Sequence, residues 1–228
     1  RDGLISRSTI VRGLYAQVVY QLVGANDAKM ERMREAVLGL TRGWDQAHVE
    51  ELVRQTLDDV IIPIIYAEAL ELIEEHRAAG RLTVIVSSSP SETVAPIGDH
   101  LGVDRVIATR ARLDDAGRYT GDLELYCAGP AKAEAIREIA RREGIDLGRS
   151  YAYSDSITDL PMLKVVGHPV AVNPDRDLRR EIPFAGQAGT RHHAIRNRHA
   201  GGRSRKPDEF VAVDFQAERA DAGLVIVL

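Results

Sequence analysis

Three groups of polar residues in this 228-residue chain have side chains that can bind an anion or a metal ion. The first is Ser87, Ser88 and Ser89, which follow the apolar run LTVIV and precede a helix expected to begin at Pro90. A hydroxyl beside the free N–H groups at a helix amino end can form an anion site. The competing explanation is a capping box formed by Ser89 and Glu92, with Pro90 at the first helical position. Capping accounts for Ser89 but leaves Ser87 unexplained.

Lys132, in the segment AGPAKAEAI, is the second candidate. It falls in the first turn of an expected helix, where an exposed cation opposes the helix dipole by about 0.3–1 kcal/mol. The ordinary explanation is a solvated surface lysine, partly balanced by Glu134. The alternative is that a nearby anion requires the positive charge.

The third group is Asp155 and Asp159 in YSDSITDLPML, which follows the strand-like residues YAY. Two carboxylates about one helical turn apart in one crevice repel each other unless a cation neutralises them. Hard oxygen ligands in this position therefore indicate Mg²⁺. Ser156 with Asp159 also resembles a capping box, which would explain Asp159 without a metal. Asp155 has no such alternative explanation.

The elements that must position these residues fall into two blocks. Apolar residues recur at three- and four-residue spacing through residues 9 to 79, which predicts three helical segments and a fourth over 64–79. Asn26 and Asp45 are candidate N-caps within this block. The second block begins after Gly80, where the pattern changes to alternating strands and helices.

This second block predicts a parallel sheet covered by helices on both faces. A small hairpin over 111–126 interrupts the alternation. The expected strands are residues 82–86, 105–108, 151–153 and 170–172, and the expected helices are 90–101, 130–143, a segment through 163 and a segment after 174.

Composition narrows the class of protein. Hydrophobic residues make up 44% and charged residues 28%, as in folded globular proteins. No apolar run approaches the roughly 18 residues that span a bilayer, so no membrane association is expected. The net charge of −4 gives no general attraction to nucleic acid. The single cysteine, Cys127, excludes an internal disulfide and fits a cytoplasmic location.

The region after residue 182 differs from the rest. Residues 182–207 contain no Asp or Glu but six Arg or Lys residues. Nucleic-acid binding through residues 190–206 is an alternative function, although this run has no aromatic side chain to stack on bases. Two apolar runs follow, FVAVDF and LVIVL, which form either strands or no stable structure.

The segments VIVSSSP, GPAKAEAI and YSDSITDLPML together resemble the second, third and fourth motifs of the haloacid dehalogenase (HAD) superfamily. The residues of these motifs are most similar to those of subclass IB, which contains the phosphoserine-phosphatase-like hydrolases. The resemblance covers about residues 1–182, and the D-x-x-x-D pattern of the last segment is its most specific part.

The resemblance implies an α/β fold, with a Rossmann-like HAD core, a parallel sheet and an inserted helical (C1-type) cap. We expect a mainly helical cap over 1–75, the core over 76–184 and a basic, unassigned tail over 185–228. Ser87, Ser88 and Lys132 would bind the phosphoryl group of a small phosphorylated substrate. Asp155 and Asp159 would form the Mg²⁺ site, with Asp159 supporting the metal or orienting the lysine.

One motif of the family is absent. Its first motif, D-x-D-x-T/V at the end of a first strand, supplies the nucleophile and the general acid/base. Asp2 is no substitute because no apolar strand precedes it. We therefore expect about thirty to forty further residues upstream, the length of one strand and its loop.

Without that motif, the chain as written is not expected to catalyse phosphoryl transfer. A non-catalytic relic that only binds a phosphorylated ligand is the alternative. Phosphoserine is a substrate suggested by the family alone, and the sequence predicts no oligomeric state.

Overall fold

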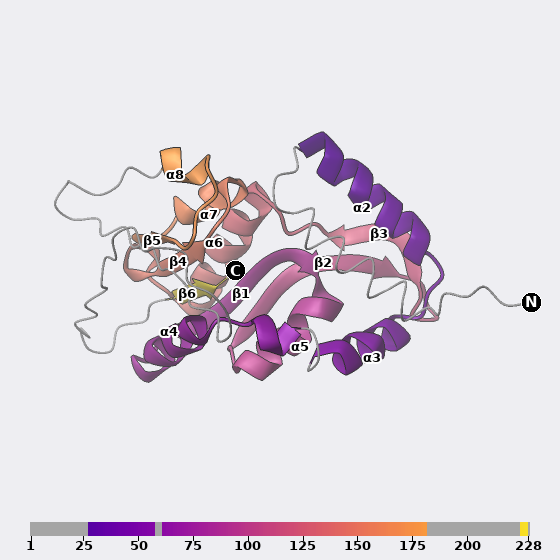
Figure 1. Cartoon of the computed structure of the whole chain (residues 1–228), viewed down its shortest axis with the longest axis horizontal. Coiled ribbons are helices and arrows are strands. Elements are labelled where there is room, and N and C mark those ends of the chain that lie inside the picture. Colours follow the sequence, from indigo (N-terminus) through magenta and orange to yellow (C-terminus); the bar gives the residue numbers. More distant parts are fainter. Residues whose placement is uncertain (1–26, 58–60, 182–223, 228) are drawn as a thin grey trace, which may run out of the picture. The chain divides into compact units, whose positions relative to one another are not determined.

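A computed structural model describes residues 27–57, 61–181 and 224–227 of the chain (Figure 1). The described residues divide into two compact units. Unit 1 contains residues up to Pro63 together with Ala111–Glu124, and unit 2 contains Ile64–Arg110 and the residues from Leu125 onward. The elements, in chain order, are α2 (Asp27–Thr41), α3 (Gln46–Thr56), η2 (Ile62–Ile64), α4 (Ala67–Ala78), β1 (Leu82–Pro90), α5 (Ser91–Leu101), β2 (Arg105–Leu113), β3 (Tyr119–Leu125), α6 (Pro130–Glu143), η3 (Leu147–Arg149), β4 (Tyr151–Ser154), η4 (Ile157–Asp159), α7 (Leu160–Leu163), β5 (His168–Ala171), α8 (Leu178–Glu181) and β6 (Leu224–Val227).

Unit 1 contains helices α2 and α3 and the hairpin that joins β2 to β3. Asp45 caps α3, because its Oδ1 accepts a hydrogen bond of 3.0 Å from His48 N. The turn between the helices is tied to the hairpin, since Gly43 N donates to Tyr119 O at 2.8 Å. The predicted cap at Asp45 and the predicted hairpin are therefore confirmed. The first expected helical segment and Asn26 lie outside the described residues.

Unit 2 is built on a sheet whose full strand order is β3-β2-β1-β6-β4-β5. The pairs β1/β2, β1/β6, β6/β4 and β4/β5 are all parallel. The β-branched residues of LTVIV and the aromatic and small residues of YAYS suit strands that are buried on both faces. The predicted parallel sheet in an α/β fold is confirmed.

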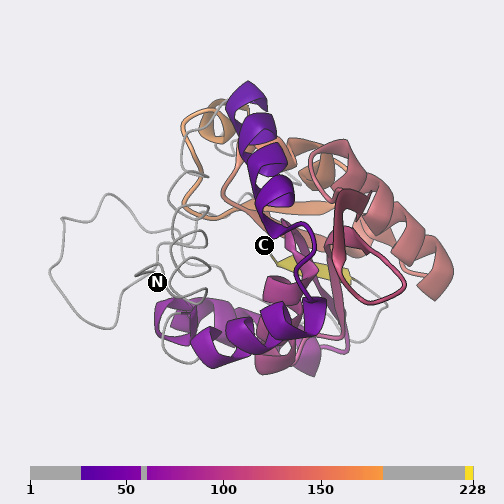
Figure 2. The same ribbon diagram turned by 90° about the vertical axis from the view of Figure 1, so that its right-hand side faces the viewer.

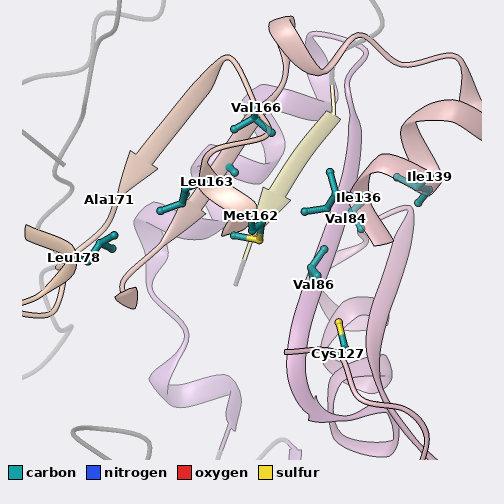
Figure 3. Close-up of a cluster of buried hydrophobic side chains, with 11 residues drawn as sticks. Val84, Val86, Cys127, Ile136, Ile139, Met162, Leu163, Val166, Ala171 and Leu178 are labelled. Carbon is teal, nitrogen blue, oxygen red and sulfur yellow. The ribbon is translucent and has the colours of Figure 1, made fainter. Parts of the chain in front are cut away.

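Alternating residues of β1 and β4 face opposite sides of this sheet. Val84, Val86 and Ala152 belong to a core cluster that also contains side chains of α6 and α7, including Ile136 and Met162 (Figure 3). All five of these side chains are fully buried. This cluster fixes α6, which carries Lys132, against the strands that carry the other candidate residues.

Helices α4 and α5 cover the other face. Ile85 of β1 packs with Val94 of α5, and Tyr153 of β4 packs with Leu72 of α4. The views in Figures 1 and 2 show the sheet of unit 2 between these two helical layers. The predicted helices on both faces are therefore present.

The observed boundaries differ from the predicted ones in three places. The division into units places α4 in unit 2, not in a cap that ends at residue 75, and places residues 111–124 in unit 1, not in the core. Strand β1 continues to Pro90, so α5 begins at Ser91. Hydrophobic periodicity identified α4 as a helix but carries no information on which partner buries its apolar side.

The region after residue 184 is the third difference. Residues 224–227 form β6, a central strand of the sheet, and so part of the predicted tail is structural. The basic run over 190–206 lies outside the described residues. Among the helices that the structure describes, none combines the length and apolar character needed to cross a bilayer.

Candidate active site

Ser87 and Asp155 lie at the same edge of the sheet of unit 2. Val84 of β1 and Ala152 of β4 both pair with Ile226 of β6, so they lie at the same level. Ser87 and Asp155 each come three residues later along parallel strands. Strands separated by one intervening strand lie about 10 Å apart. Both residues therefore flank the carboxyl end of β6, where ligands bind in open parallel sheets.

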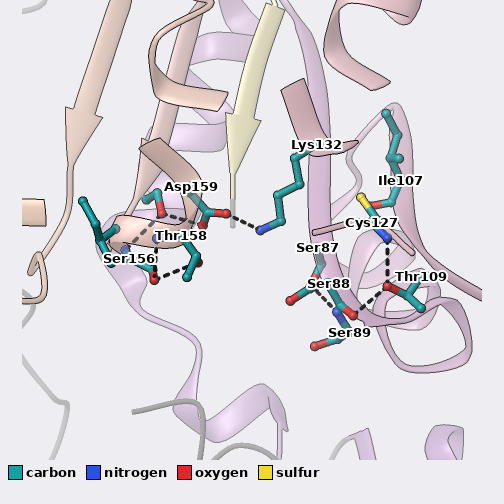
Figure 4. A network of polar contacts seen from close by, with 12 residues as sticks. Ser87, Ser88, Ser89, Ile107, Thr109, Cys127, Lys132, Ser156, Thr158 and Asp159 are labelled. Atoms are coloured by element: carbon teal, nitrogen blue, oxygen red, sulfur yellow. Dashed lines mark hydrogen bonds and ion pairs between the residues drawn. The ribbon is translucent and has the colours of Figure 1, made fainter. Parts of the chain in front are cut away.

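A network of hydrogen bonds holds the serine segment in place (Figure 4). Ser89 N donates to Ser87 Oγ at 3.2 Å, and Thr109 Oγ1 donates to Ser88 O at 2.8 Å. Thr109 Oγ1 in turn accepts a hydrogen bond of 3.2 Å from Cys127 N. Because the Ser87 hydroxyl is used here as an acceptor, its single O–H remains available to donate to a ligand.

The capping explanation for the serines is not supported. The N-cap of α5 is Pro90, and no side chain makes a capping hydrogen bond there. The extended backbone of β1 runs past Ser89, which places this serine before the cap position. Ser87 and Ser89 instead bond to each other, which local sequence did not predict.

Lys132 is buried and ion-paired. Its Nζ lies 2.7 Å from Asp159 Oδ1, and both side chains are 6% exposed (Figure 4). The explanation of Lys132 as a solvated surface residue is therefore wrong. Burying an ammonium group is costly unless an anion compensates it, and Asp159 supplies that anion. Because the ammonium group carries three N–H donors, it can bind a further anion as well.

Asp159 is held by two partners. Its Oδ2 accepts a hydrogen bond of 2.8 Å from Ser154 Oγ, while its Oδ1 faces Lys132. Ser156 caps η4 by accepting from Thr158 N at 3.3 Å. The predicted capping role is therefore confirmed for Ser156, but the Asp159 carboxylate makes no return bond to Ser156. Asp159 Oδ1 forms the ion pair but has no hydrogen-bond partner among the described residues, whereas Oδ2 is bonded to Ser154, so Asp159 can orient Lys132.

Asp155 differs from Asp159 in being exposed. Desolvation of its carboxyl group by the surrounding protein raises its pKa, and the negative charges of Asp159 and Asp175 raise this pKa further. Its own backbone N–H and Lys132 act in the opposite direction. A carboxylate surrounded by like charges gains from a divalent cation, which would lower its pKa.

The residues of this site fit a Mg²⁺ ion that binds through a carboxylate of the described residues. Mg²⁺ keeps several water ligands and commonly binds through one or two carboxylates together with substrate phosphate. Asp155 is a hard oxygen ligand of this kind. The described residues contain no group of three or more His, Cys, Asp or Glu side chains that could hold a metal by themselves. Asp155 and Asp159 both remain predicted metal ligands, of which Asp155 is the exposed one and Asp159 the one paired with Lys132.

The sequence interpretation missed two hydroxyl residues that organise this site. Ser154, buried at the end of β4, orients Asp159, and Thr109 braces the serine segment through the bonds described above. Ser154 directly precedes Asp155, so its position was a usable signal. Thr109 lies on a different strand, and only the pairing of β1 with β2 brings it to Ser88.

Comparison with known proteins identifies the family of this arrangement. The model of the haloacid dehalogenase-like hydrolases matches residues 1–164. The chain is 58% identical over 181 residues to an inhibition of morphological differentiation protein from Streptomyces azureus, which covers 79% of this chain and 65% of that protein. It is 47% identical over 185 residues to a probable phosphatase from Mycobacterium tuberculosis, which covers 81% of this chain and 64% of that protein.

A solved structure shares the fold. It is described as a phospho-aspartyl intermediate analogue of phosphoserine phosphatase and matches with a TM-score of 0.58 at 26% identity. The match covers 77% of this chain and 82% of that one. The chain spans slightly less than two thirds of the two curated relatives. The family model covers well over half of the chain, and the chain therefore belongs to the haloacid dehalogenase-like hydrolases.

Proposed function

We propose that the protein is a Mg²⁺-dependent phosphomonoester hydrolase that acts on a small phosphorylated metabolite such as phosphoserine. The observation that carries this proposal is the buried ion pair between Lys132 and Asp159, at the sheet edge shared by Ser87 and Asp155. This arrangement brings an ammonium group, a hydroxyl and an exposed carboxylate to the carboxyl ends of the parallel strands. Positioning and charge stabilisation of this kind account for most of the catalysis of phosphoryl transfer.

Each residue has a separate role in the proposed reaction. Ser87 donates its O–H to a phosphoryl oxygen, and Ser88 lines the same turn. Lys132 neutralises negative charge on the phosphoryl group, while Asp159 keeps the ammonium group pointed at it. Asp155 holds Mg²⁺, which when bound offsets the charge of the phosphate and the attacking carboxylate.

The nucleophile is proposed to lie in a segment beyond the 228 residues. In the family reaction an aspartate carboxylate attacks phosphorus, the substrate alcohol leaves, and water then hydrolyses the aspartyl-phosphate. The sequence directly upstream of Arg1 provides the simplest check. A strand ending in D-x-D-x-T at that place would support a catalytic parent protein.

A functional test can be made by adding such a strand to the chain. We expect the extended protein to hydrolyse p-nitrophenyl phosphate with Mg²⁺, and Asp155→Asn to lower kcat/KM by at least about 100-fold, because electrostatic stabilisation of the transition state is lost. The matched control is Asp99→Asn, which removes an exposed carboxylate from α5. Full turnover by Asp155→Asn would refute the role of Asp155. Phosphate binding without turnover would instead support the non-catalytic relic.

A binding test needs no added segment. The raised pKa of Asp155 means that protons compete with Mg²⁺ at higher pH than they would at an ordinary aspartate. Mg²⁺ affinity should therefore fall as the pH is lowered toward the acidic range. Isothermal titration calorimetry between pH 7.5 and 5 measures this fall, and Asp155→Asn should remove it. An affinity independent of pH would contradict Asp155 as the ligand.

A cytoplasmic location is part of the same proposal. Cys127 is a buried free thiol, as expected for a protein of a reducing compartment.

A further inference from the structure

Asp175 lies in the loop between β5 and α8 and contacts the turn that carries Asp155 and Asp159. Its backbone N donates to Asp155 O at 2.7 Å. Its Oδ2 accepts a hydrogen bond of 2.9 Å from Ile157 N. One residue thus bonds to the chain on both sides of Ser156, at the start of η4. The loop and the turn come from neighbouring parallel strands, since β5 pairs with β4.

Capping explains only half of these contacts. Asp175 Oδ1 accepts hydrogen bonds from Leu178 N at 2.7 Å and Asp177 N at 3.1 Å, which is an ordinary cap of the short helix α8. Serine, threonine or asparagine would serve this purpose equally well. The Ile157 bond uses the second oxygen. Only a carboxylate has two acceptor oxygens, because the amide nitrogen of asparagine donates and cannot accept.

From this geometry we infer that Asp175 is a positioning residue, which fixes the Asp155–Asp159 turn and thereby places the Asp155 carboxylate and the partner of Lys132. The turn is short, so a shift at Ile157 is passed on to both aspartates. Asp159 sets the direction of the Lys132 ammonium group through the 2.7 Å ion pair. The link from this turn to Mg²⁺ rests on the function proposed above, whereas the link from Asp175 to the turn rests on the hydrogen bonds alone.

The test compares three conservative variants of the full chain, together with Asp175→Ala. Asp175→Asn keeps the shape and the cap of α8 but loses the acceptor for Ile157 N. Asp177→Asn removes a negative charge from the same loop without touching Ile157, since its carboxylate lies 3.5 Å from Arg180. Asp146→Asn alters a similar turn at the opposite end of β4, where Asp146 Oδ1 accepts from Gly148 N at 2.8 Å. These two controls separate position from charge and from general loss of stability.

The first measurement is hydrogen–deuterium exchange of peptides covering residues 154–163. Loss of one hydrogen bond to a charged group, about 1.5 kcal/mol, should speed exchange in this segment about 10-fold in Asp175→Asn. Asp175→Ala, which also loses the cap, should show at least the same increase. Asp146→Asn keeps an acceptor for Gly148 N and should leave exchange over 154–163 unchanged. Unchanged exchange over 154–163 in both Asp175 variants, or an equal increase there in Asp146→Asn, would overturn the inference.

The second measurement is the Kd for Mg²⁺ by isothermal titration calorimetry. Substitution of a residue that orients a metal ligand typically weakens metal binding by about 10-fold or more. We expect that loss in Asp175→Asn and a change below about 2-fold in Asp177→Asn. An equal loss in both variants would show that charge, and not position, is the cause. Absence of Mg²⁺ binding by the unaltered chain would count against the proposed metal site, and the exchange comparison would still decide whether Asp175 holds the turn.

Discussion

At the residue scale, the ion pair between Lys132 and Asp159 determines how both residues of the site are interpreted. From the sequence, each residue had an ordinary explanation, a solvated lysine and a capping carboxylate. Both explanations assumed that neighbours in sequence supply the partners. The structure instead pairs two residues from different elements, α6 and η4, and buries them together. The sequence could predict the types of residue at the site but not which of them engage each other, because that depends on how α6 packs on the sheet.

This pairing leads to a stability prediction. Lys132→Met should leave the Asp159 carboxylate buried without its cation and destabilise the protein by about 3–5 kcal/mol. Asp159→Asn should also destabilise, and the double variant should lose less than the sum of the two single losses. Urea unfolding followed by circular dichroism measures all three. The control is Lys164→Met, an exposed lysine, which should change stability by about 0.5 kcal/mol or less. Strict additivity would show that the pair does not interact.

At the element scale, alternating strand and helix patterns predicted most of unit 2 from local sequence. Strands β1, β4 and β5 and helices α5 and α6 all lie within a few residues of their expected positions. The place of β6 could not be predicted in this way. Its four residues carry a strand-forming pattern, but pairing with β1 joins Leu82 to Leu224, a contact that no local pattern encodes. The division into units was missed for the same reason, since it depends on long-range packing.

The central place of β6 can be tested with one substitution. Val225 lies opposite both Thr83 and Tyr151. Val225→Pro removes a backbone N–H from the centre of the sheet, where proline is normally excluded. We expect loss of the cooperative unfolding transition, or a destabilisation of roughly 3 kcal/mol or more. Val225→Ala keeps the N–H and should be clearly more stable than the proline variant in thermal unfolding. Equal stability of the two variants would argue against β6 as a central strand.

At the scale of the whole molecule, a buried histidine makes stability depend on pH. His76 of α4 is 1% exposed, and its Nε2 lies 2.7 Å from the Tyr153 hydroxyl. Burial, with a smaller contribution from the Arg81 charge, lowers the pKa of His76 from 6.5 to about 3. The unfolded chain therefore takes up a proton below pH 6.5 while the folded protein does not, and folding loses free energy as the pH falls.

The size of this effect can be measured directly. One such group should reduce the free energy of unfolding by roughly 1 kcal/mol per pH unit below pH 6.5. Urea unfolding at pH 7.0, 6.0 and 5.0 should show this slope, and His76→Gln should have a shallower one. His100→Gln, which alters an exposed histidine of α5, should leave the slope unchanged. A slope that is identical in the wild type and in His76→Gln would mean that His76 does not contribute.

The position of β6 also has a consequence for biosynthesis. A ribosome makes β1 and β4 long before residues 224–227, so the nascent chain exposes two unpaired strand borders until that segment is made. The gap between β1 and β4 can be filled only after residues 224–227 are made. Until then each border can pair with a strand of another chain. Chaperones that hold these borders until residues 224–227 are made should therefore raise the yield of native protein.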